Sequence, residues 1–161
     1  MAVDYYLKFD KITGESTAVK FEGNIDIESF SWGVTNTGSV VAAGAGGGAG
    51  KVSFQDIHLT SSMSKASPQL FQFCARGESP GNAVLTAIQA GKSQLDFLTI
   101  KMSDVLISGY QTGGSQGEEL PKESFSLNFA KVEVDYRPQQ DTGALADAIR
   151  GLFDLKQLKL A

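Results

Sequence analysis

The single thiol and the single imidazole of this sequence are the first side chains to consider for catalysis. Cys74 and His58 are the only cysteine and histidine in 161 residues, and a thiolate beside an imidazole would give a nucleophile and a base for hydrolysis. The sequence offers no identifiable third group to orient the imidazole. Cys74 also lies among Leu70, Phe71 and Phe73, where a free cysteine usually packs as a small hydrophobic residue. We therefore expect Cys74→Ala to change stability without removing any catalysis.

Metal binding and acid–base chemistry find little support either. One cysteine and one histidine cannot supply a four-ligand zinc cluster, and a lone cysteine excludes an intrachain disulfide. Asp26 with Glu28, or Glu118 with Glu119, could form a pair of carboxylates for acid–base work. Acidic residues so close in sequence usually lie in solvent, and nothing around them predicts burial. We predict no catalytic residue, no metal and no cofactor, and hence a protein that is not an enzyme.

The glycine-rich stretch from Gly38 to Gly50 has the composition of a phosphate-binding loop but not its spacing. A P-loop would need glycine at position 45 and serine or threonine at position 52, where the sequence has Ala45 and Val52. The dinucleotide pattern is met by residues 44–49, yet a strand rather than a helix is predicted to follow, so no helix N-terminus would face the phosphates. A long, uncharged loop of small residues is typical of a binding or assembly element instead.

Composition limits the class of partner and the compartment. Lys and Arg number 14 against 18 Asp and Glu, a net charge of −4, and no basic cluster is present, so we expect no nucleic-acid partner. The N-terminal residues carry charges at Asp4 and Lys8 and lack the apolar centre of a secretory signal, and no apolar run reaches about 18 residues. We predict one domain, residues 1–161, that folds in the cytoplasm and does not insert into a membrane.

Alternation of apolar and polar residues predicts strands over much of the chain. The clearest run extends from Val3 to Phe9. Further runs lie at residues 51–60, 82–90, 94–102 and 105–110. Two longer runs, Phe21 to Val34 and Ser124 to Tyr136, change the phase of the alternation part-way, the first of them near Glu28-Ser29. Such a strand buries opposite faces in its two halves, which allows it to turn the corner of a barrel.

One short helix is predicted at residues 67–76. Ser67 stands at the expected N-cap, Pro68 at the first helical position and Gly77 where a helix would end. Its buried side would carry Leu70, Phe71 and Cys74.

These elements together predict a mainly β fold. Two strands that change face, several tight turns and a single helix favour an antiparallel β-barrel, made of two sheets, with one short α-helix packed on its side. The pattern after Arg137 leaves two alternatives open. Residues 141–150 could begin a helix, whereas residues 153–156 alternate like an edge strand.

Several motifs occur in an order that is similar to that of a known family. They are Val3-Asp4-Tyr5-Tyr6-Leu7-Lys8, Gly14-Glu15-Ser16, Ile25-Asp26-Ile27, Ser29-Phe30-Ser31-Trp32-Gly33, Gly50-Lys51-Val52, Pro68, Thr112-Gly113-Gly114-Ser115 and Leu127-Asn128-Phe129-Ala130-Lys131-Val132-Glu133-Val134-Asp135-Tyr136. The Ser-Trp-Gly block, the glycine loop and the last block are specific in this order. The sequence thereby resembles the haemolysin-coregulated protein (Hcp) family, tube proteins of the bacterial type VI secretion system.

This resemblance implies a structural role in an assembly. Members form hexameric rings with a central pore, the rings stack into a tube that works with contractile sheath and spike proteins, and small effector proteins travel in the pore. The protein would be cytoplasmic before firing and would then be secreted without a signal peptide. Ser31 would face the pore and contact effectors. Rings would stack through Gly38, Ser39, Val40, Val41, Gly44, Gly46, Gly47, Gly48 and Gly50. A secondary interface turn would comprise Gly113, Gly114, Ser115 and Gln116.

A function from another class remains open on the sequence. A closed antiparallel barrel can also work as a monomer that binds a small apolar ligand inside. The mass of the protein in solution separates the two hypotheses, because only the tube subunit must form a ring.

Overall fold

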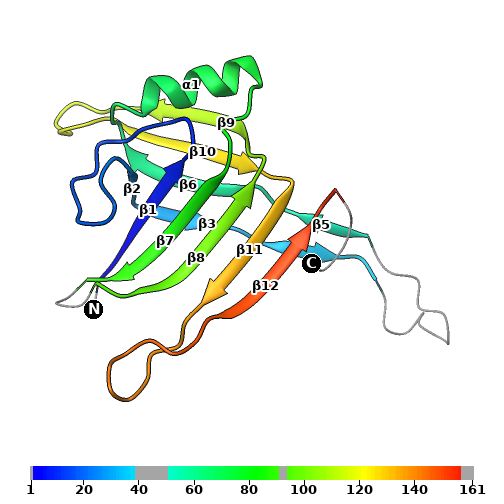
Figure 1. The fold of residues 1–161 in the computed structure, drawn as a ribbon. Helices are drawn as coiled ribbons and strands as arrows, with labels where there is room; N and C mark the ends of the chain where they lie inside the picture. The colour runs from blue at the N-terminus through cyan, green and yellow to red at the C-terminus, as the bar shows by residue number, and fades with distance from the viewer. Residues whose placement is uncertain (1, 39–50, 91–93, 157–161) are drawn as a thin grey trace.

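The computed structural model describes residues 2–38, 51–90 and 94–156, which form strands and one helix (Figure 1). The strands are β1 (Val3–Phe9), β2 (Ile25–Ile27), β3 (Ser29–Ser31), β4 (Val34–Asn36), β5 (Val52–Phe54), β6 (Ile57–Ser62), β7 (Ala83–Gln89), β8 (Asp96–Ser103), β9 (Leu106–Gly113), β10 (Lys122–Asn128), β11 (Lys131–Tyr136) and β12 (Ile149–Asp154). The helix is α1 (Ser67–Arg76). The predicted mainly β fold with one short helix is confirmed.

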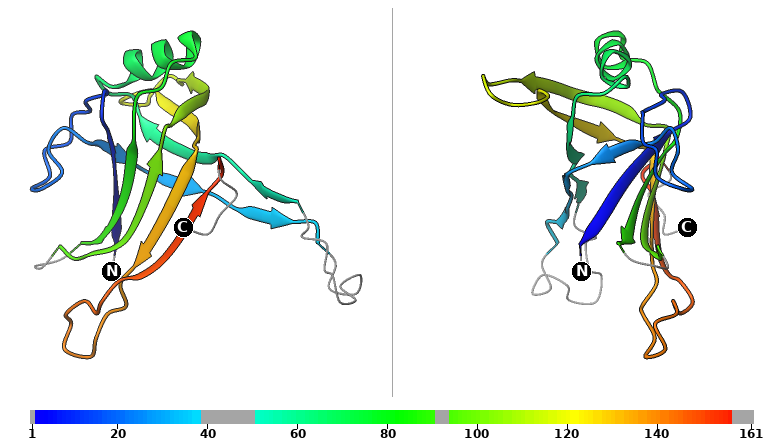
Figure 2. Two further views of the ribbon diagram at one scale, coloured as in Figure 1. Left: turned by 45° about the vertical axis from the view of Figure 1, so that its right-hand side comes forward. Right: turned by 90° about the vertical axis from the view of Figure 1, so that its left-hand side faces the viewer.

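The strands form two main antiparallel sheets and a smaller one. The six-stranded sheet has the order β12-β11-β8-β7-β1-β2, and the four-stranded sheet has the order β3-β6-β10-β9. The two sheets wrap around a common core, and α1 lies over the four-stranded sheet beside β9 (Figures 1 and 2). Strands β4 and β5 pair only with each other and project from this body; we call this pair the arm.

The two predicted changes of phase are confirmed as the corners where the chain passes between the sheets. At Glu28 the chain leaves β2 of the six-stranded sheet and enters β3 of the four-stranded sheet. At Phe129 and Ala130 it passes back from β10 to β11. The corners are held by backbone hydrogen bonds, from the Glu28 N–H to the Thr60 oxygen (2.8 Å) and from the Ala130 N–H to the Ser103 oxygen (2.9 Å). Each half of the run therefore buries the face that its own sheet turns to the core.

The core lies between the two sheets. Its fully buried side chains include Leu7, Ile25, Ile57, Leu59, Leu85, Met102, Ile107 and Leu127. On β6 the buried residues Ile57, Leu59 and Ser61 alternate with His58, Thr60 and Ser62 on the outside. The period-2 pattern of the sequence thus determines which side chains reach the core.

The structure differs from the strand predicted at residues 51–60, and it decides between the two alternatives for the tail. The run at 51–60 was expected as one strand but is broken at Gln55 and Asp56 into β5 and β6. The break brings Phe54 to the same apolar core as Ile57 and Leu59, although continuous alternation would have put it on the opposite side. In the tail, an edge strand forms as the second alternative expected, because β12 pairs along β11, and residues 141–148 form no helix. Its bounds differ from the expected 153–156, since β12 begins at Ile149 and ends at Asp154.

The predicted helix forms, but two of its residues are placed differently. The N-cap is Ala66 and not Ser67, whose hydroxyl instead accepts a hydrogen bond from the Ser64 N–H (2.9 Å). Gly77 ends the helix in the left-handed conformation (φ 66°), as expected from its lack of a side chain. Phe71 was predicted to be buried and is 58% exposed. Leu70, Phe73 and Cys74 have the spacing of one helical face and pack toward the core, and Phe71 falls at its margin.

Candidate functional site

The outer face of the four-stranded sheet carries an unusual concentration of small polar side chains. Its outward positions alternate with core residues along β3, β6, β9 and β10, and all of them are exposed or half-buried except Ser126, which is buried. We call this surface the hydroxyl face. Its residues are Ser29, Ser31, His58, Thr60, Ser62, Ser108, Gln111, Lys122, Ser124, Ser126 and Asn128. Most of these side chains end in a hydroxyl or amide group that both donates and accepts hydrogen bonds.

Strand register arranges these residues in rows across the sheet. One row runs through Ser29, Thr60, Ser124 and Gln111, which are successive partners on β3, β6, β10 and β9. The next row runs through Ser31, His58, Ser126 and Gly109. Ser31 is therefore an exposed member of a broad polar surface, and its four-strand row has small side chains at three of its positions. Its predicted role in a pore stays a prediction.

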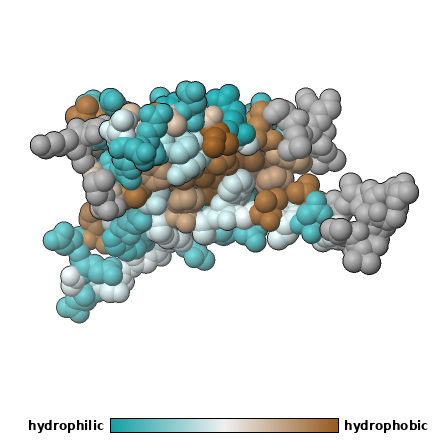
Figure 3. All heavy atoms as spheres, turned by 90° about the horizontal axis from the view of Figure 1, so that it is seen from below, coloured by the Kyte–Doolittle hydropathy of each residue, from teal (hydrophilic) through white to brown (hydrophobic). Residues whose placement is uncertain are grey.

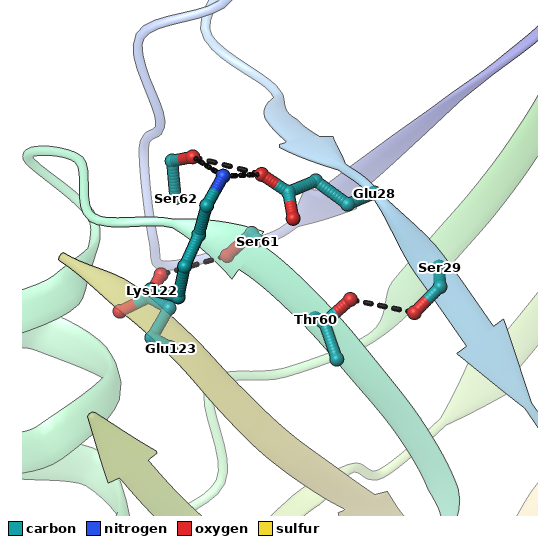
Figure 4. A network of polar contacts seen from close by, with 7 residues as sticks. All are labelled: Glu28, Ser29, Thr60, Ser61, Ser62, Lys122 and Glu123. Carbon is teal, nitrogen blue, oxygen red and sulfur yellow. Dashed lines mark hydrogen bonds and ion pairs between the residues drawn. The ribbon is translucent and has the colours of Figure 1, made fainter. Parts of the chain in front are cut away.

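Lys122 is the one lysine of the hydroxyl face, and a neighbouring carboxylate neutralises its charge. The Lys122 ammonium group contacts the Glu28 carboxylate at the corner between β2 and β3, and it donates to the Ser62 hydroxyl (2.8 Å; Figure 4). The Ser62 hydroxyl in turn donates to the same Glu28 oxygen (2.8 Å). The hydrogen bond from Lys122 is the main cause that holds the pKa of the Glu28 carboxyl below its usual value. This corner therefore presents a closed polar triad and no free cation.

Some hydroxyl groups on the rest of the face are paired with one another or with a carboxylate. The Ser29 and Thr60 hydroxyl oxygens lie 2.6 Å apart across β3 and β6 (Figure 4). Toward the other end of the sheet, Asp56 accepts from the Ser108 hydroxyl (2.5 Å) and from the Asn128 amide (2.9 Å). These contacts fix the side chains in place and leave a surface that is polar and weakly charged.

Replacing Lys122 with alanine is expected to raise the pKa of Glu28 toward its ordinary range. The lowered native pKa stabilises the fold above the unfolded-state pKa, and this contribution is lost as the pH falls through the native value. Both side chains are about half exposed, so the change in the free energy of unfolding should stay below about 1 kcal/mol. An NMR pH titration of the Glu28 carboxyl checks the shift. Ser124→Ala, at the next outward position of β10, is the control, and an unchanged Glu28 pKa in Lys122→Ala would contradict the pairing.

A buried polar cluster supports the hydroxyl face from beneath. Glu123 is only 3% exposed, and its two carboxylate oxygens accept from the Ser61 hydroxyl (2.9 Å) and the Tyr110 hydroxyl (2.7 Å). Burial, and then the hydrogen bond and charge of Glu123, raise the pKa of Tyr110 to about 12. Glu123 was not predicted from the sequence. The signal was present, because Glu123 shares the inward phase of Phe125 and Leu127 on β10.

The residues considered for catalysis are not brought together. His58 lies outside on β6, whereas Cys74 packs against the core from α1. Asp26 is exposed on β2, and Glu118 and Glu119 are exposed in the turn between β9 and β10. In the described ranges, no group of three or more His, Cys, Asp or Glu side chains is placed to hold a metal ion. Nor is any helix there long and apolar enough to cross a bilayer.

The predicted stacking loop is only partly described. Gly38 is exposed, and its N–H donates to the Asn36 side chain (2.8 Å). Residues 39–50, with Ser39, Val40, Val41, Gly44, Gly46, Gly47, Gly48 and Gly50, lie outside the described residues. The arm that leads to them is defined by the pairs Val34–Phe54 and Asn36–Val52. In the secondary turn, Gly113 ends β9, and Gly114, Ser115 and Gln116 are exposed after it.

Comparison with known proteins assigns the chain to a family. Residues 6–136 match the sequence family described as type VI secretion system effector, Hcp. The chain is also 42% identical to Protein hcp1 of Pseudomonas aeruginosa strain PAO1 over 145 residues, which cover 89% of each chain. The chain belongs to the Hcp family. The resemblance seen in the sequence motifs is thereby confirmed, and so is the connection of this Hcp protein with type VI secretion.

Solved structures of Hcp proteins share the fold along its whole length. A structure described as a type six secretion system protein has a TM-score of 0.90 at 28% identity, with 98% of this chain and 99% of the other covered. The crystal structure of Hcp1 from Salmonella typhimurium has a TM-score of 0.79 at 27% identity, with 99% and 100% covered. The two-sheet architecture with one helix is therefore the architecture of the family.

Proposed function

We propose that this Hcp protein is a structural, non-enzymatic tube subunit, in which one domain of residues 1–161 forms hexameric rings that stack around a pore. The observation that carries this proposal is the hydroxyl face, with Ser31 at its exposed edge strand. It would line the pore and contact small effector proteins. The subunit would be made in the cytoplasm, act with the contractile sheath and spike proteins, and leave the cell with the tube. It needs no cofactor, nucleic acid or membrane insertion for this role.

The chemistry of the hydroxyl face suits a passage for varied proteins. Hydroxyl groups stay hydrated and form hydrogen bonds that contribute only about 1 kcal/mol each in water. Its lysine is paired with Glu28, and Asp56 at its margin is satisfied by Ser108 and Asn128. Few unpaired charges then remain to hold an effector tightly. An effector protein in the pore would form weak hydrogen bonds with the hydroxyl face and would not bind to it tightly.

The sheet edges support contacts between copies around a ring. Strands β3 and β9 are the two edges of the four-stranded sheet, and edge strands present unpaired backbone groups. A ring joins one edge region of each copy to a different region of the next, and the rotation closes the assembly. Copies placed in this way would turn their hydroxyl faces toward a common axis.

The first experiment is the mass of the purified protein by light scattering on a sizing column. We expect a mass of roughly six times the 17.1 kDa protomer, because in a closed ring every copy uses both of its contact regions. A monomer at high protein concentration would contradict the tube proposal. It would favour the alternative, a monomeric barrel that binds a small apolar ligand.

Deleting residues Gly44–Gly48 is expected to leave the ring mass unchanged and to abolish the stacking of rings. Small residues without charge allow close approach of a neighbouring backbone, and a shortened loop would no longer reach the next ring. Electron microscopy of concentrated protein measures the length of the stacks. The control replaces the same residues with a Gly/Ser segment of equal length, which should stack nearly as well. Unshortened stacks in the deletion variant would rule out this loop as the stacking element.

A further inference from the structure

A hollow lies at the corner where the chain passes from β2 to β3. It has a volume of about 250 Å³. Its apolar lining comes from β2, from the residue after β6 and from the segment before β10, namely Ile25, Ile27, Met63 and Leu120. Its polar lining includes the carboxyl groups of Glu15, Asp26 and Glu28. The hollow thus combines apolar contact surface with acidic groups in one place.

Two of the three carboxylates keep an uncompensated charge. Glu28 is neutralised by its lysine partner (Figure 4). Glu15 and Asp26 are exposed, and neither side chain has a hydrogen bond or an ion pair in the described part of the chain. Burial, and then the charges of Asp4 and Asp26, raise the pKa of the Tyr6 hydroxyl on the neighbouring strand. The surface around the hollow therefore has a negative potential, which favours a cationic occupant.

The opposite end of the molecule carries the arm, which has a single charge. The segment between β1 and β2 lies at one end of the molecule, and the arm points away from the other end (Figure 1 and the left view of Figure 2). Apolar side chains line a groove along the arm, among them Val34, Val52 and Phe54. Seen from below, apolar side chains also reach the surface between the layers of the molecule (Figure 3). Lys51 is the only charged residue between positions 33 and 55, so the arm brings one positive charge to a partner.

Lys51 stands at the outer end of the described arm. Its backbone is fixed to Thr37, because the Thr37 N–H donates to the Lys51 oxygen (3.3 Å) and the Lys51 N–H donates to the Thr37 hydroxyl (3.2 Å). Its side chain is exposed, and none of the described residues pairs with its ammonium group. A lysine side chain can lay its methylene groups along apolar surface while its charge stays beside carboxylates. Lys51 therefore matches both properties of the hollow.

We propose that Lys51 of one copy of this chain inserts into the hollow of a second copy, with its ammonium group between Glu15 and Asp26. The occupant is a second copy because the lysine and the hollow have complementary charges and lie at opposite ends of one molecule. A contact between two different surfaces of identical chains runs head to tail, and it continues along a line unless a rotation closes it. Such a contact suits the repeated stacking of identical units.

The contact is weak in a single pair of chains and gains strength from repetition in a ring. The ammonium group and both carboxylates are exposed, so one such pair is screened by salt and contributes little alone. When every copy of a ring makes the same contact, the first contact raises the effective concentration for the others. The association of whole rings should therefore respond steeply to a change of charge that is repeated in each copy.

This inference rests on the proposed function, and it adds the surface that receives the arm. In a tube, the arm of each copy would reach toward the next ring, where the hollow at the β2–β3 corner would accept Lys51. The hydroxyl face takes no part in this contact, because Lys122 of that face already neutralises Glu28. Stacking and the lining of the pore would thus use separate surfaces of the subunit.

Reversal of the charges tests the contact. Lys51→Glu and, separately, Glu15→Lys/Asp26→Lys should each shorten the stacks seen by electron microscopy about tenfold at an unchanged ring mass, because attraction becomes repulsion at every contact. The triple variant Lys51→Glu/Glu15→Lys/Asp26→Lys should stack again, since opposite charges then meet with their places exchanged. Arg137→Glu is the matched control, because it makes the same change of charge at an exposed residue outside the arm and should not shorten the stacks.

Stack length and ring mass report on different proposals. Shortened stacks in the reversed variants, with recovery in the triple variant, support the Lys51 contact. Stacks of wild-type length in Lys51→Glu, or no recovery in the triple variant, overturn it. An unchanged ring mass in those cases leaves the tube subunit in place, whereas a monomeric wild-type protein contradicts the tube subunit itself.

A chemical cross-link detects the contact even when stacks are too short to see. A carbodiimide joins an amine to a carboxylate that touches it, and it acts on the wild-type protein. In a mixture of isotope-labelled and unlabelled protein, we expect mass spectrometry to find Lys51 joined to Glu15 or Asp26 of a different chain. The yield should fall about tenfold in roughly 1 M salt, where the Debye length is only about 3 Å. If Lys51 is joined only to other carboxylates, or to none, a second copy does not fill the hollow and the proposal is overturned.

Discussion

Replacing Leu59 with alanine is expected to lower the free energy of unfolding by about 3–4 kcal/mol. Leu59 is 0% exposed on the central strand β6, where it pairs with Phe30 of β3 on one side and with Phe125 of β10 on the other. The substitution removes apolar contacts and leaves a cavity, because neighbours on two sheets cannot both move in to fill it. Urea denaturation followed by Trp32 fluorescence, at one fixed protein concentration, measures the change.

The control for this prediction lies on the same strand. His58 precedes Leu59, points outward on the hydroxyl face and is exposed. His58→Ala should therefore change the free energy of unfolding by no more than about 0.5 kcal/mol. Equal losses in the two variants would mean that the outer face of β6 is itself buried, for example between copies in a ring. In that case the hydroxyl face could not line an open pore.

The regular strands and both corners were predictable from the sequence because each depends on local alternation. The Val3–Phe9 strand appears with the predicted bounds, and the change of phase near Glu28 marks the passage from one sheet to the other. The break at Gln55 and Asp56 was missed, although the apolar positions change there from Val52 and Phe54 to Ile57 and Leu59. Two adjacent polar residues also fit an imperfect alternation within one strand, and the packing of Phe54 on both the arm and the core shows that the chain breaks there.

The candidate site could be predicted only in part, for a physical reason. Ser31 was identified through the resemblance to the Hcp family, whereas its row partners Ser126 and Gly109 lie far away in sequence. Their adjacency depends on the register of β3, β6, β10 and β9, which tertiary packing sets. The exposure of Phe71 was missed for a similar reason, since one helical face was assigned without knowing which side the sheet would cover.

Replacing Glu123 with alanine is expected to destabilise the protein by about 3 kcal/mol. The Ser61 and Tyr110 hydroxyls would lose their acceptor in a site from which water is largely excluded, and a cavity would remain beneath the hydroxyl face. Glu123→Gln should cost less, about 1–2 kcal/mol, because its amide oxygen still accepts one of the two hydrogen bonds. Urea denaturation of both variants measures the difference, and equal stability of the alanine variant and wild type would contradict the network.

The same network predicts how stability depends on alkaline pH. The native pKa of Tyr110, about 12, is raised above the ordinary value of 10.0, so the native state holds the phenol proton more tightly than the unfolded state does. This contribution is fully present below pH 10 and is lost as the pH rises through about 12. In Glu123→Gln the negative charge is gone and the pKa of Tyr110 should fall, though burial, the larger cause, keeps it above its ordinary value. Tyrosinate absorbance, with Tyr110→Phe subtracted, measures the shift. An unchanged titration in Glu123→Gln would show that burial acts alone, and that the carboxylate holds the hydroxyl in position without setting its proton affinity.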